Sequence, residues 1–494
     1  MALVLLVTAC RPEVRPAGLT LLIESPPDSL DNRLALSANG ERLAQLIAPG
    51  LVTFDEAGRA VPDLAVAFAW LDPVTLEVRL RQGLVFHGGA PLTAADVVAT
   101  YQGILSGAAP SAKREKYACV RSVEAVDPLT VRFHLHRPHA PLLTELTLSV
   151  LPESRAQGPG AAEQALHPLG AGPFAFEDRP DEDHVDLVAF ARYYAGAPKV
   201  PALHVRVVRD ETTRVLELLK GRADLTVNSI SPELLPSLEE RGLRVLTVPG
   251  NGFAYLGFNV RSGPLADVRV RRALCHLVDV APILTFKFHG LARAATGLLA
   301  PDHWAYAPTP GCHRDVSLAR QLLAQAGVPG LHLTLKTSTD RFRRALALVV
   351  KDQWAQGDVD LDVRAEEFGT LLDDARQGRF EVLMLKWSST LEPDLMRQVF
   401  ASSEVPSAAN HFGGLNRGGY TRPALDEVLT RAAAAPQPER AALYQAGLML
   451  LDEDVPVIPL WHEDLVAVLS SRVRHFAPAP NGFWTGIATA ELSP

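Results

Sequence analysis

Hydrophobic and polar residues follow two different periods along this chain. Residues 76–86, LEVRLRQGLVF, alternate with a period of two, which is typical of half-buried strands. Residues 120–136 predict a hairpin, whereas residues 31–51 carry apolar side chains at helical spacing. Thr93, with Asp96 three residues later, predicts the capped start of another helix. The first third of the chain therefore combines antiparallel strands with helices.

From residue 200 onward, predicted strands alternate with predicted helices. Strands are expected at 203–209, 224–228, 331–337, 359–366 and 380–387, with two more on either side of Pro249-Gly250. Helices are expected at 211–221, 317–327 and 340–356, with one long helix at 267–284. This alternation predicts an α/β fold with a mostly parallel sheet. Two such blocks, about 165–260 and 265–470, suggest two lobes, and the antiparallel part at 50–160 suggests an added domain.

Length and charge narrow the class of protein. The chain has 494 residues, which corresponds to two to four domains, and a net charge of −8. A negative chain without a basic patch argues against nucleic-acid binding. Apolar residues never run for 18 positions, so we expect no transmembrane helix.

The first ten residues, MALVLLVTAC, form an apolar run that ends in small residues and Cys10. This pattern resembles a bacterial lipoprotein signal, although the basic residues that usually begin one are missing. The resemblance implies cleavage before Cys10 and acyl chains on this residue, which together give stable membrane anchoring. The alternative is a hydrophobic start that arises by chance.

The remaining cysteines are Cys119, Cys275 and Cys312, and no two of them have CxxC spacing. Three cysteines cannot all pair. Cys275 lies in a helical apolar pattern, where a small buried thiol is expected. We therefore predict no disulfide framework.

Motifs for catalysis or metal binding are incomplete. Residues 170–175, GAGPFA, lack the following helix that a dinucleotide site needs, and His462-Glu463 lacks the second histidine of a zinc motif. Asp358, Asp360 and Asp362 are followed by valine where a calcium loop requires glycine. His134, His136 and His139 have no nearby cysteine or carboxylate to complete a zinc site. We expect no catalytic residues, no metal site and no cofactor.

A longer pattern is more specific. Residues 58–65 read G-x-x-x-P-x-L-A, and residues 75–97 contain the run LRQGLVFHGGAPLTAADV. Further pieces follow in order: HPLGAGPF, YLGFN, PLADVRVRRAL, LARQLLAQAG, NRGGYTRPALDEVL and DEDVPVIPLW. Together they resemble family 5 of the bacterial extracellular solute-binding proteins, the dipeptide, oligopeptide and nickel receptors of ABC importers. Gly88 stands where this family usually has aspartate.

The resemblance implies a two-lobed periplasmic-binding-protein fold of type II, of class α/β, with an extra third domain. It divides the chain into a signal and spacer at 1–18, lobe I at 19–50 plus 165–260 plus 470–494, the extra domain at 51–164, and lobe II at 261–469. The two lobes are expected to close over a ligand, with hinge crossings near Asn259 and near residue 470.

The best candidate for a ligand site is the segment KWSSTLEPD at 386–394, which follows the predicted strand 380–387. Ligands of open α/β sheets bind outside the carboxyl ends of strands. We therefore expect ligand contacts from Trp387, Ser388, Ser389, Thr390 and Glu392. Further candidates lie at predicted turns or helix interruptions: Asn39, Asn251, Phe253 and Tyr420.

The class of ligand stays open at this point. The resemblance implies that peptide-binding relatives carry aspartate, which pairs with the peptide α-amino group, where this chain has Thr390. A buried ammonium group without a counter-charge is costly, which argues against a free peptide amino terminus. Glu392 could substitute, although its neighbours Pro393 and Asp394 suggest an exposed loop. Peptides, nickel chelates and other small polar solutes all remain candidates.

The predicted function is that of a lipid-anchored substrate-binding protein of an ABC importer, which is not an enzyme. Its partners would be a small solute or peptide and an ABC permease with its ATPase. We expect a monomer in the periplasm or cell envelope, held at the membrane by its lipid anchor and without nucleic-acid partners. The alternatives are a ligand sensor of the same fold and a hydrolase, which would alter its ligand.

Overall fold

The computed structural model describes residues 17–493 except 112 and 411. One large mixed sheet of eleven strands runs through the described part, in the order β15-β14-β16-β12-β17-β11-β1-β10-β9-β8, with β13 paired to β17. Its strands are β1 (Leu19–Ile23), β8 (Phe174–Asp181), β9 (His184–Ala189), β10 (Ala202–Val207), β11 (Leu225–Val227), β12 (Arg244–Phe258), β13 (Ala292–Ala294), β14 (His332–Ser338), β15 (Asp360–Glu366), β16 (Val382–Trp387) and β17 (Val457–Leu469).

The prediction of a mostly parallel sheet is wrong. Parallel pairing joins β1 to β10 and β11, and β14 to β15 and β16. The other pairs are antiparallel, because β12 and β17 cross the sheet against their neighbours and β8, β9 and β10 are consecutive antiparallel strands. A βα repeat in the sequence does not reveal such crossing strands.

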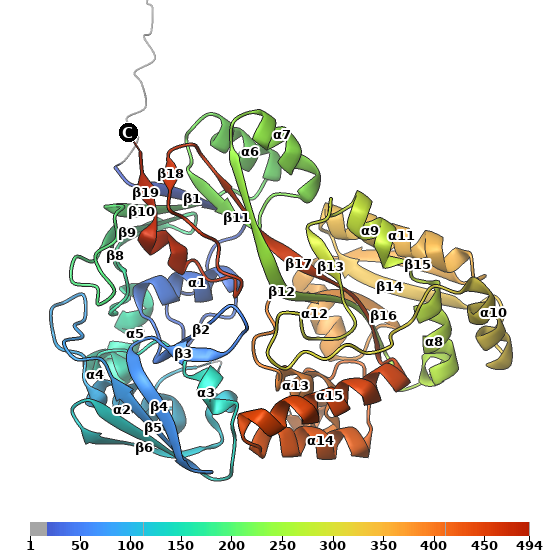
Figure 1. Ribbon diagram of the computed structural model, residues 1–494, viewed down its shortest axis with the longest axis horizontal. Coiled ribbons are helices and arrows are strands. Elements are labelled where there is room, and N and C mark those ends of the chain that lie inside the picture. The colour runs from blue at the N-terminus through green and yellow to red at the C-terminus, as the bar shows by residue number, and fades with distance from the viewer. Residues whose placement is uncertain (1–16, 112, 411, 494) are drawn as a thin grey trace, which may run out of the picture.

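The first body of the molecule, defined here as the part built on β1 to β11, lies on the left in Figure 1. Helices α1 (Ala38–Ile47), α6 (Glu211–Leu219) and α7 (Leu235–Glu240) pack against its part of the large sheet. Beside it, α2 (Ala94–Ser106) packs on a four-stranded antiparallel sheet with the order β4-β5-β7-β6. Its other elements are β2 (Val52–Phe54), β3 (Ala60–Pro62), β4 (Ala65–Asp72), β5 (Thr75–Leu80), β6 (Val120–Asp127), β7 (Thr130–Leu135), α3 (Leu142–Glu145), α4 (Glu153–Ala156) and α5 (Gly158–Leu166).

The second body, defined here as the part built on β13 to β16 and helices α8 to α15, lies on the right in Figure 1. One core lies between its sheet and α8, α10 and α11, and a second core lies between the opposite face and α12 to α15. The helices are α8 (Val268–Leu277), α9 (Val280–Phe286), α10 (Val316–Gln325), α11 (Arg341–Ala355), α12 (Phe368–Arg376), α13 (Leu395–Phe400), α14 (Pro423–Ala434) and α15 (Gln437–Asp454). After β17 the chain returns to the first body, where β18 (Val473–Arg474) pairs with β19 (Glu491–Leu492).

Several local predictions are confirmed. The capping box at Thr93 and Asp96 starts α2, and β6 with β7 forms the predicted hairpin.

Other local predictions need correction. The helix predicted at 267–284 is two helices, and the helix predicted at 31–51 is reduced to α1, with Asn39 in its first turn. Among the described residues, none of the helices has the length and apolar character needed to cross a bilayer.

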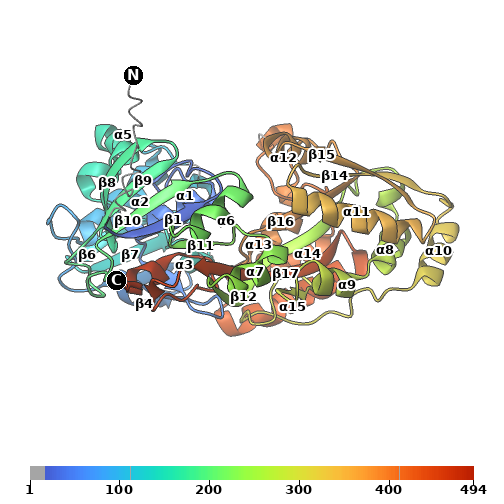
Figure 2. The same cartoon turned by 90° about the horizontal axis from the view of Figure 1, so that it is seen from above.

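The two bodies lie side by side and are joined along the ribbon formed by β12 and β17 (Figure 2). The two strands predicted around Pro249-Gly250 are in fact one strand of 15 residues with a bulge. Val248 lies opposite Leu465 and Gly252 opposite Glu463, so three residues of β12 face a single residue of β17. Glycine is required at 250, because a Cβ atom there would lie 2.2 Å from the carbonyl oxygen of Glu463.

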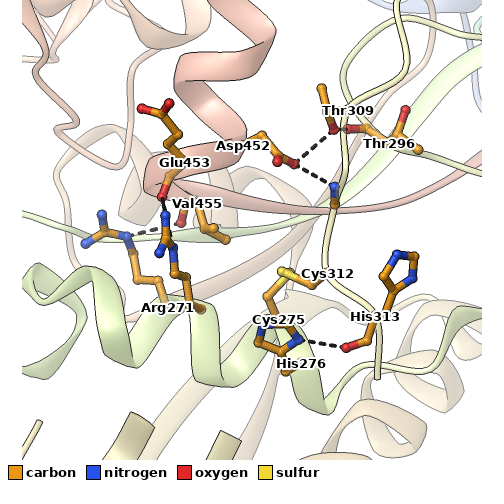
Figure 3. Close-up of a disulfide and its surroundings, with 12 residues drawn as sticks. Arg271, Cys275, His276, Thr296, Thr309, Cys312, His313, Asp452, Glu453 and Val455 are labelled. Atoms are coloured by element: carbon orange, nitrogen blue, oxygen red, sulfur yellow. Dashed lines mark hydrogen bonds between the residues drawn. A yellow bond between two sulfur atoms is a disulfide. The ribbon is translucent and has the colours of Figure 1, made fainter. Parts of the chain in front are cut away.

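A disulfide joins Cys275 of α8 to Cys312, with Cα atoms 5.8 Å apart, so the prediction of unpaired thiols is wrong for this pair (Figure 3). Two further contacts hold the segment that leads to Cys312. Asp452 of α15 accepts hydrogen bonds from the Thr309 hydroxyl at 2.9 Å and from the Gly311 N–H at 3.0 Å. Cys312 lies in a segment without periodic pattern, so its spacing from Cys275 in the sequence could not reveal the contact. Cys119 is buried and unpaired.

Removing this disulfide should destabilise the second body. The bond spans 37 residues, and a crosslink over a loop of this length stabilises a protein by about 2–4 kcal/mol through the entropy of the unfolded chain. We expect replacement of Cys275 and Cys312 by serine to lower the free energy of unfolding by this amount in a denaturant titration. The wild type should lose the same stability on reduction, and the double variant should be indifferent to reductant. An unchanged midpoint for fully reduced wild type would contradict this account.

Candidate functional site

The parallel strands of the first body point their carboxyl ends at the middle of the ribbon. Leu225 of β11 lies opposite Leu469 of β17, and Val227 lies opposite Ala467, so β11 runs toward the centre of β17. Since β1 is parallel to both β11 and β10, all three strands end on the same side.

The parallel strands of the second body point at the ribbon from the other direction. Val382 of β16 lies opposite Phe258 of β12, and Trp387 lies opposite Phe253, which in turn pairs with His462 of β17. Strands β14 and β15 run parallel to β16. The carboxyl ends of three parallel strands in each body therefore point toward the other body, and β11 and β16 pair directly with the ribbon between them. Open α/β sheets bind ligands outside such strand ends.

Three of the predicted contact residues lie at the end of β16. Ser388 is exposed, and Trp387 and Ser389 are half-buried. The indole Nε1 of Trp387 and the hydroxyl of Ser389 are buried atoms without a hydrogen-bond partner among the described residues. Both groups can donate a hydrogen bond, so this end of the strand presents donors that have no well-formed hydrogen bond inside the protein.

Thr390 has a structural contact in this arrangement. Its side chain is fully buried, and its hydroxyl donates a 2.6 Å hydrogen bond to the carbonyl oxygen of Asn251 in the bulge of β12. A Cβ atom on the neighbouring Gly252 would approach the carbonyl oxygens of Trp387 and Ser388 to 3.2 and 3.3 Å. The loop after β16 is therefore held to the β12–β17 ribbon by the Thr390 hydrogen bond and by close backbone packing.

The neighbours of Glu392 in the sequence suggested an exposed loop, but the structure largely buries this residue. Its side chain is 12% exposed and forms an ion pair with Arg440, and it accepts a 3.0 Å hydrogen bond from Thr144 of α3. Asp394 is buried, and burial raises its pKa to about 6 even though Arg397 lies 3.0 Å away. Each of these two carboxylates already has a positive partner.

The remaining candidates are mostly buried. Asn39 donates to the backbone oxygen of Ser25 at 3.1 Å, which ties α1 to the end of β1. The Tyr420 hydroxyl donates to Asp454 at 2.7 Å. Phe253 is buried and stacks on Tyr255 with ring centroids 5.5 Å apart. Their ligand roles remain predictions. Cys10 lies outside the described residues.

Arg417 was missed by the sequence reasoning. Its guanidinium carbon lies 5.6 Å from the centre of the Trp387 ring, and its Nε atom is buried without a partner among the described residues. Burial raises the pKa of the adjacent Tyr255 hydroxyl, while the charge of Arg417 works to lower it. The sequence marks Arg417 only by its place between Asn416 and two glycines.

Direct hydrogen bonds connect the two bodies next to the loop that follows β16. The Trp304 N–H donates to the carbonyl oxygen of Ala57 at 3.2 Å, and the Ala140 N–H donates to that of Ala433 at 2.8 Å. His303, just before Trp304, accepts from the Ala305 N–H at Nδ1, so Nε2 carries the proton and donates to the Leu391 carbonyl oxygen at 2.9 Å. Burial, together with Arg440 and Arg59, lowers the pKa of His303 to about 4 despite that hydrogen bond.

Two cavities inside the second body are small. One of about 40 Å³ lies beside the Cys275–Cys312 disulfide and Phe253, and another of about 30 Å³ lies between Tyr255 and Arg417. Each has room for a few water molecules and is too small for a peptide. The three histidines considered as metal ligands do not gather either: His134 instead contacts Glu124 at 3.1 Å. No group of three or more metal-ligating side chains occurs within the described residues.

Two α/β bodies joined by crossing strands, with parallel strand ends directed at the crossing, are the architecture of a periplasmic binding protein of the type II fold. A solved structure with this fold is NikZ from Campylobacter jejuni in complex with Ni(L-His), with a TM-score of 0.84, 23% identity, and coverage of 96% of this chain and 100% of the other. The predicted type II fold class is confirmed.

Residues 59–405 match the family described as bacterial extracellular solute-binding proteins, family 5. The chain belongs to this family. Among its relatives, the probable di/tripeptide-binding protein 5 of Pseudomonas aeruginosa is 27% identical over 94% of both chains. Heme-binding protein A of Haemophilus influenzae is 26% identical over 89% of this chain and 86% of its own length.

Protonation of His303 should destabilise the folded protein in acid. Its folded pKa is about 4, against about 6.5 unfolded, so the unfolded chain binds the proton first and stability falls as the pH drops from 6.5 toward 4. We expect His303→Gln to reduce this loss by about 2–3 kcal/mol between pH 7 and pH 4, measured by denaturant titration. Asp394, with its raised pKa, opposes the loss in both proteins, so its contribution cancels in the comparison. Equal pH slopes for variant and wild type would disprove the role of His303.

Proposed function

We propose that this protein is the substrate-binding component of an ABC importer and that it captures a peptide or a related small polar solute between its two bodies. The main support is that three parallel strands in each body point their carboxyl ends toward the other body, with β11 and β16 paired directly to the β12–β17 ribbon between them. Family membership supports the same class of function. Peptide is the favoured ligand class, because the relative from Pseudomonas aeruginosa is named for di- and tripeptides.

Capture by closure follows from the connections between the bodies. The ribbon is continuous, whereas the polar contacts beside it are isolated, such as the hydrogen bond between Thr144 and Glu392 and the exposed ion pair between Lys287 and Glu233. A ligand that touches both bodies binds only where they approach each other, so it shifts the population toward that arrangement. Release to a permease then requires no chemical change in the ligand.

The lobe boundaries form part of the proposal. Lobe I comprises 19–50, 165–260 and 470–494, the extra domain 51–164, and lobe II 261–469. The chain would then cross between the lobes at the two strands of the ribbon.

Ligand binding should raise thermal stability without turnover. A ligand selective for the folded state stabilises by about 2.7 kcal/mol at a hundred times its Kd. We expect a di- to pentapeptide to raise the melting temperature in a dose-dependent way, and mass spectrometry to recover it unchanged in equimolar amount. A cleaved peptide would point to a hydrolase, and a shift with another solute but with no peptide would refute the peptide assignment.

We also propose that Cys10 is acylated and holds the protein at the outer side of a membrane. More than one acyl chain is needed for stable anchoring, and the residues before Cys10 match such a signal. Labelled fatty acid fed to the host should appear on the wild type, and Cys10→Ser should remove it and release the protein from the membrane fraction. Label on Cys10→Ser, or none on the wild type, would contradict acylation at this residue.

A further inference from the structure

Three hydrogen-bond donors around the end of β16 lack a well-formed hydrogen bond. Trp387 Nε1, Ser389 Oγ and Arg417 Nε are all buried, and none makes a hydrogen bond of full distance and angle in the described part of the chain. The indole and guanidinium N–H groups can only donate. The Tyr255 hydroxyl lies close enough to Arg417 and Trp387 for both side chains to hydrogen-bond to it, which works to lower its pKa against the effect of burial. Neither Trp387 Nε1 nor Arg417 Nε, however, has the distance and angle of a well-formed hydrogen bond. A ligand that brings acceptors to this place can therefore complete the hydrogen bonds of these donors.

The positive charge of Arg417 also favours a ligand that brings acceptors. Within the described residues, no carboxylate forms an ion pair with Arg417, whose guanidinium lies over the Trp387 ring. The acidic residues nearby in the sequence and the sheet already have positive partners: Glu392 pairs with Arg440, Asp394 with Arg397, and Glu463 with Lys386. The positive charge of Arg417 is thus the one left without compensation beside Trp387.

The position of Arg417 is fixed before any ligand arrives. Its own carbonyl oxygen accepts a 2.8 Å hydrogen bond from Arg261, and the side chain of Asn416 donates to the carbonyl oxygens of Ala401 at 3.0 Å and Tyr420 at 2.7 Å. Stacking on tryptophan covers a face of the guanidinium and leaves its edge, which carries the N–H groups, free to bind. A planar edge of this kind matches the two oxygens of a carboxylate.

On this basis, and resting on the proposed function, we propose that Arg417, Trp387 and Ser389 bind a carboxylate group of the ligand. A free α-amino group of the ligand is not bound at this end of the site. Thr390 is buried against Asn251 and carries no charge, and the carboxylates of Glu392 and Asp394 are engaged. The ligand class is an acidic solute, such as a peptide held by its carboxylate, whose amino group is dispensable.

Three chemical forms of one ligand pool test this assignment. A randomised tripeptide pool is prepared free, N-acetylated and C-terminally amidated, and the full-length protein is incubated with each. Retained peptides are quantified by mass spectrometry after gel filtration. We expect the acetylated pool to be retained like the free pool and the amidated pool to be retained at least about tenfold less, because a site built to hydrogen-bond a group rejects analogues lacking it.

Variants separate recognition by Arg417 from general damage. Arg417→Gln should lower retention of the free pool to that of the amidated pool, and Arg417→Lys should recover part of it, because charge remains but the planar edge is lost. The matched control is Arg376→Gln on α12, where Arg376 forms only a half-exposed ion pair with Asp373, and it should behave like the wild type. If Arg417→Gln fails to fold, the comparison of the three pools on the wild type still decides.

The outcomes distinguish this inference from the proposed function. Loss of binding on acetylation but not on amidation would overturn the carboxylate assignment and leave peptide capture standing. Equal retention of all three pools would also overturn the carboxylate assignment, since the protein would then recognise neither terminus of the peptide. Retention of none of the pools would refute peptide capture itself, and the assignment would fall with it.

Discussion

Pairing between β12 and β17 runs from Arg244 opposite Leu469 to Gly257 opposite Val457, and the position of the proposed ligand site depends on this ribbon. Each strand leaves one body and enters the other, so a shift in register would move the end of β16 away from the ends of β1 and β11. Register is strongly specified where side chains alternate between two buried faces, as they do here. Phe253 and Tyr255 enter one core of the second body, whereas Ala254 and Leu256 enter the other.

The bulge at 249–251 connects the β12–β17 ribbon to the loop after β16. It interrupts the ladder where both sets of strand ends point, and it gives the Asn251 carbonyl oxygen to Thr390. The binding loop is thereby attached to the ribbon at the place where the ladder is weakest.

Much of the fold could be predicted from the sequence, but less of the site. The capping box at Thr93 and the α/β class follow from local pattern, and the family follows from motifs that extend over most of the chain. The position of Trp387 at a strand end was likewise visible. The crossing of β12 and β17 and the Cys275–Cys312 bond were not, because both depend on contacts between distant segments.

The same limit explains why Thr390 drew attention and Arg417 did not. A missing carboxylate is visible in a sequence when a family pattern supplies the expected residue, and it suggests only what the ligand lacks. An uncompensated charge becomes visible once the partners of every neighbouring group are known. Glu392, the apparent substitute, is held by Arg440 and Thr144, so the balance of charge beside Trp387 is positive. Buried donors and charges without partners are costly, and a protein that retains them beside a hinge is organised around a partner that arrives from outside.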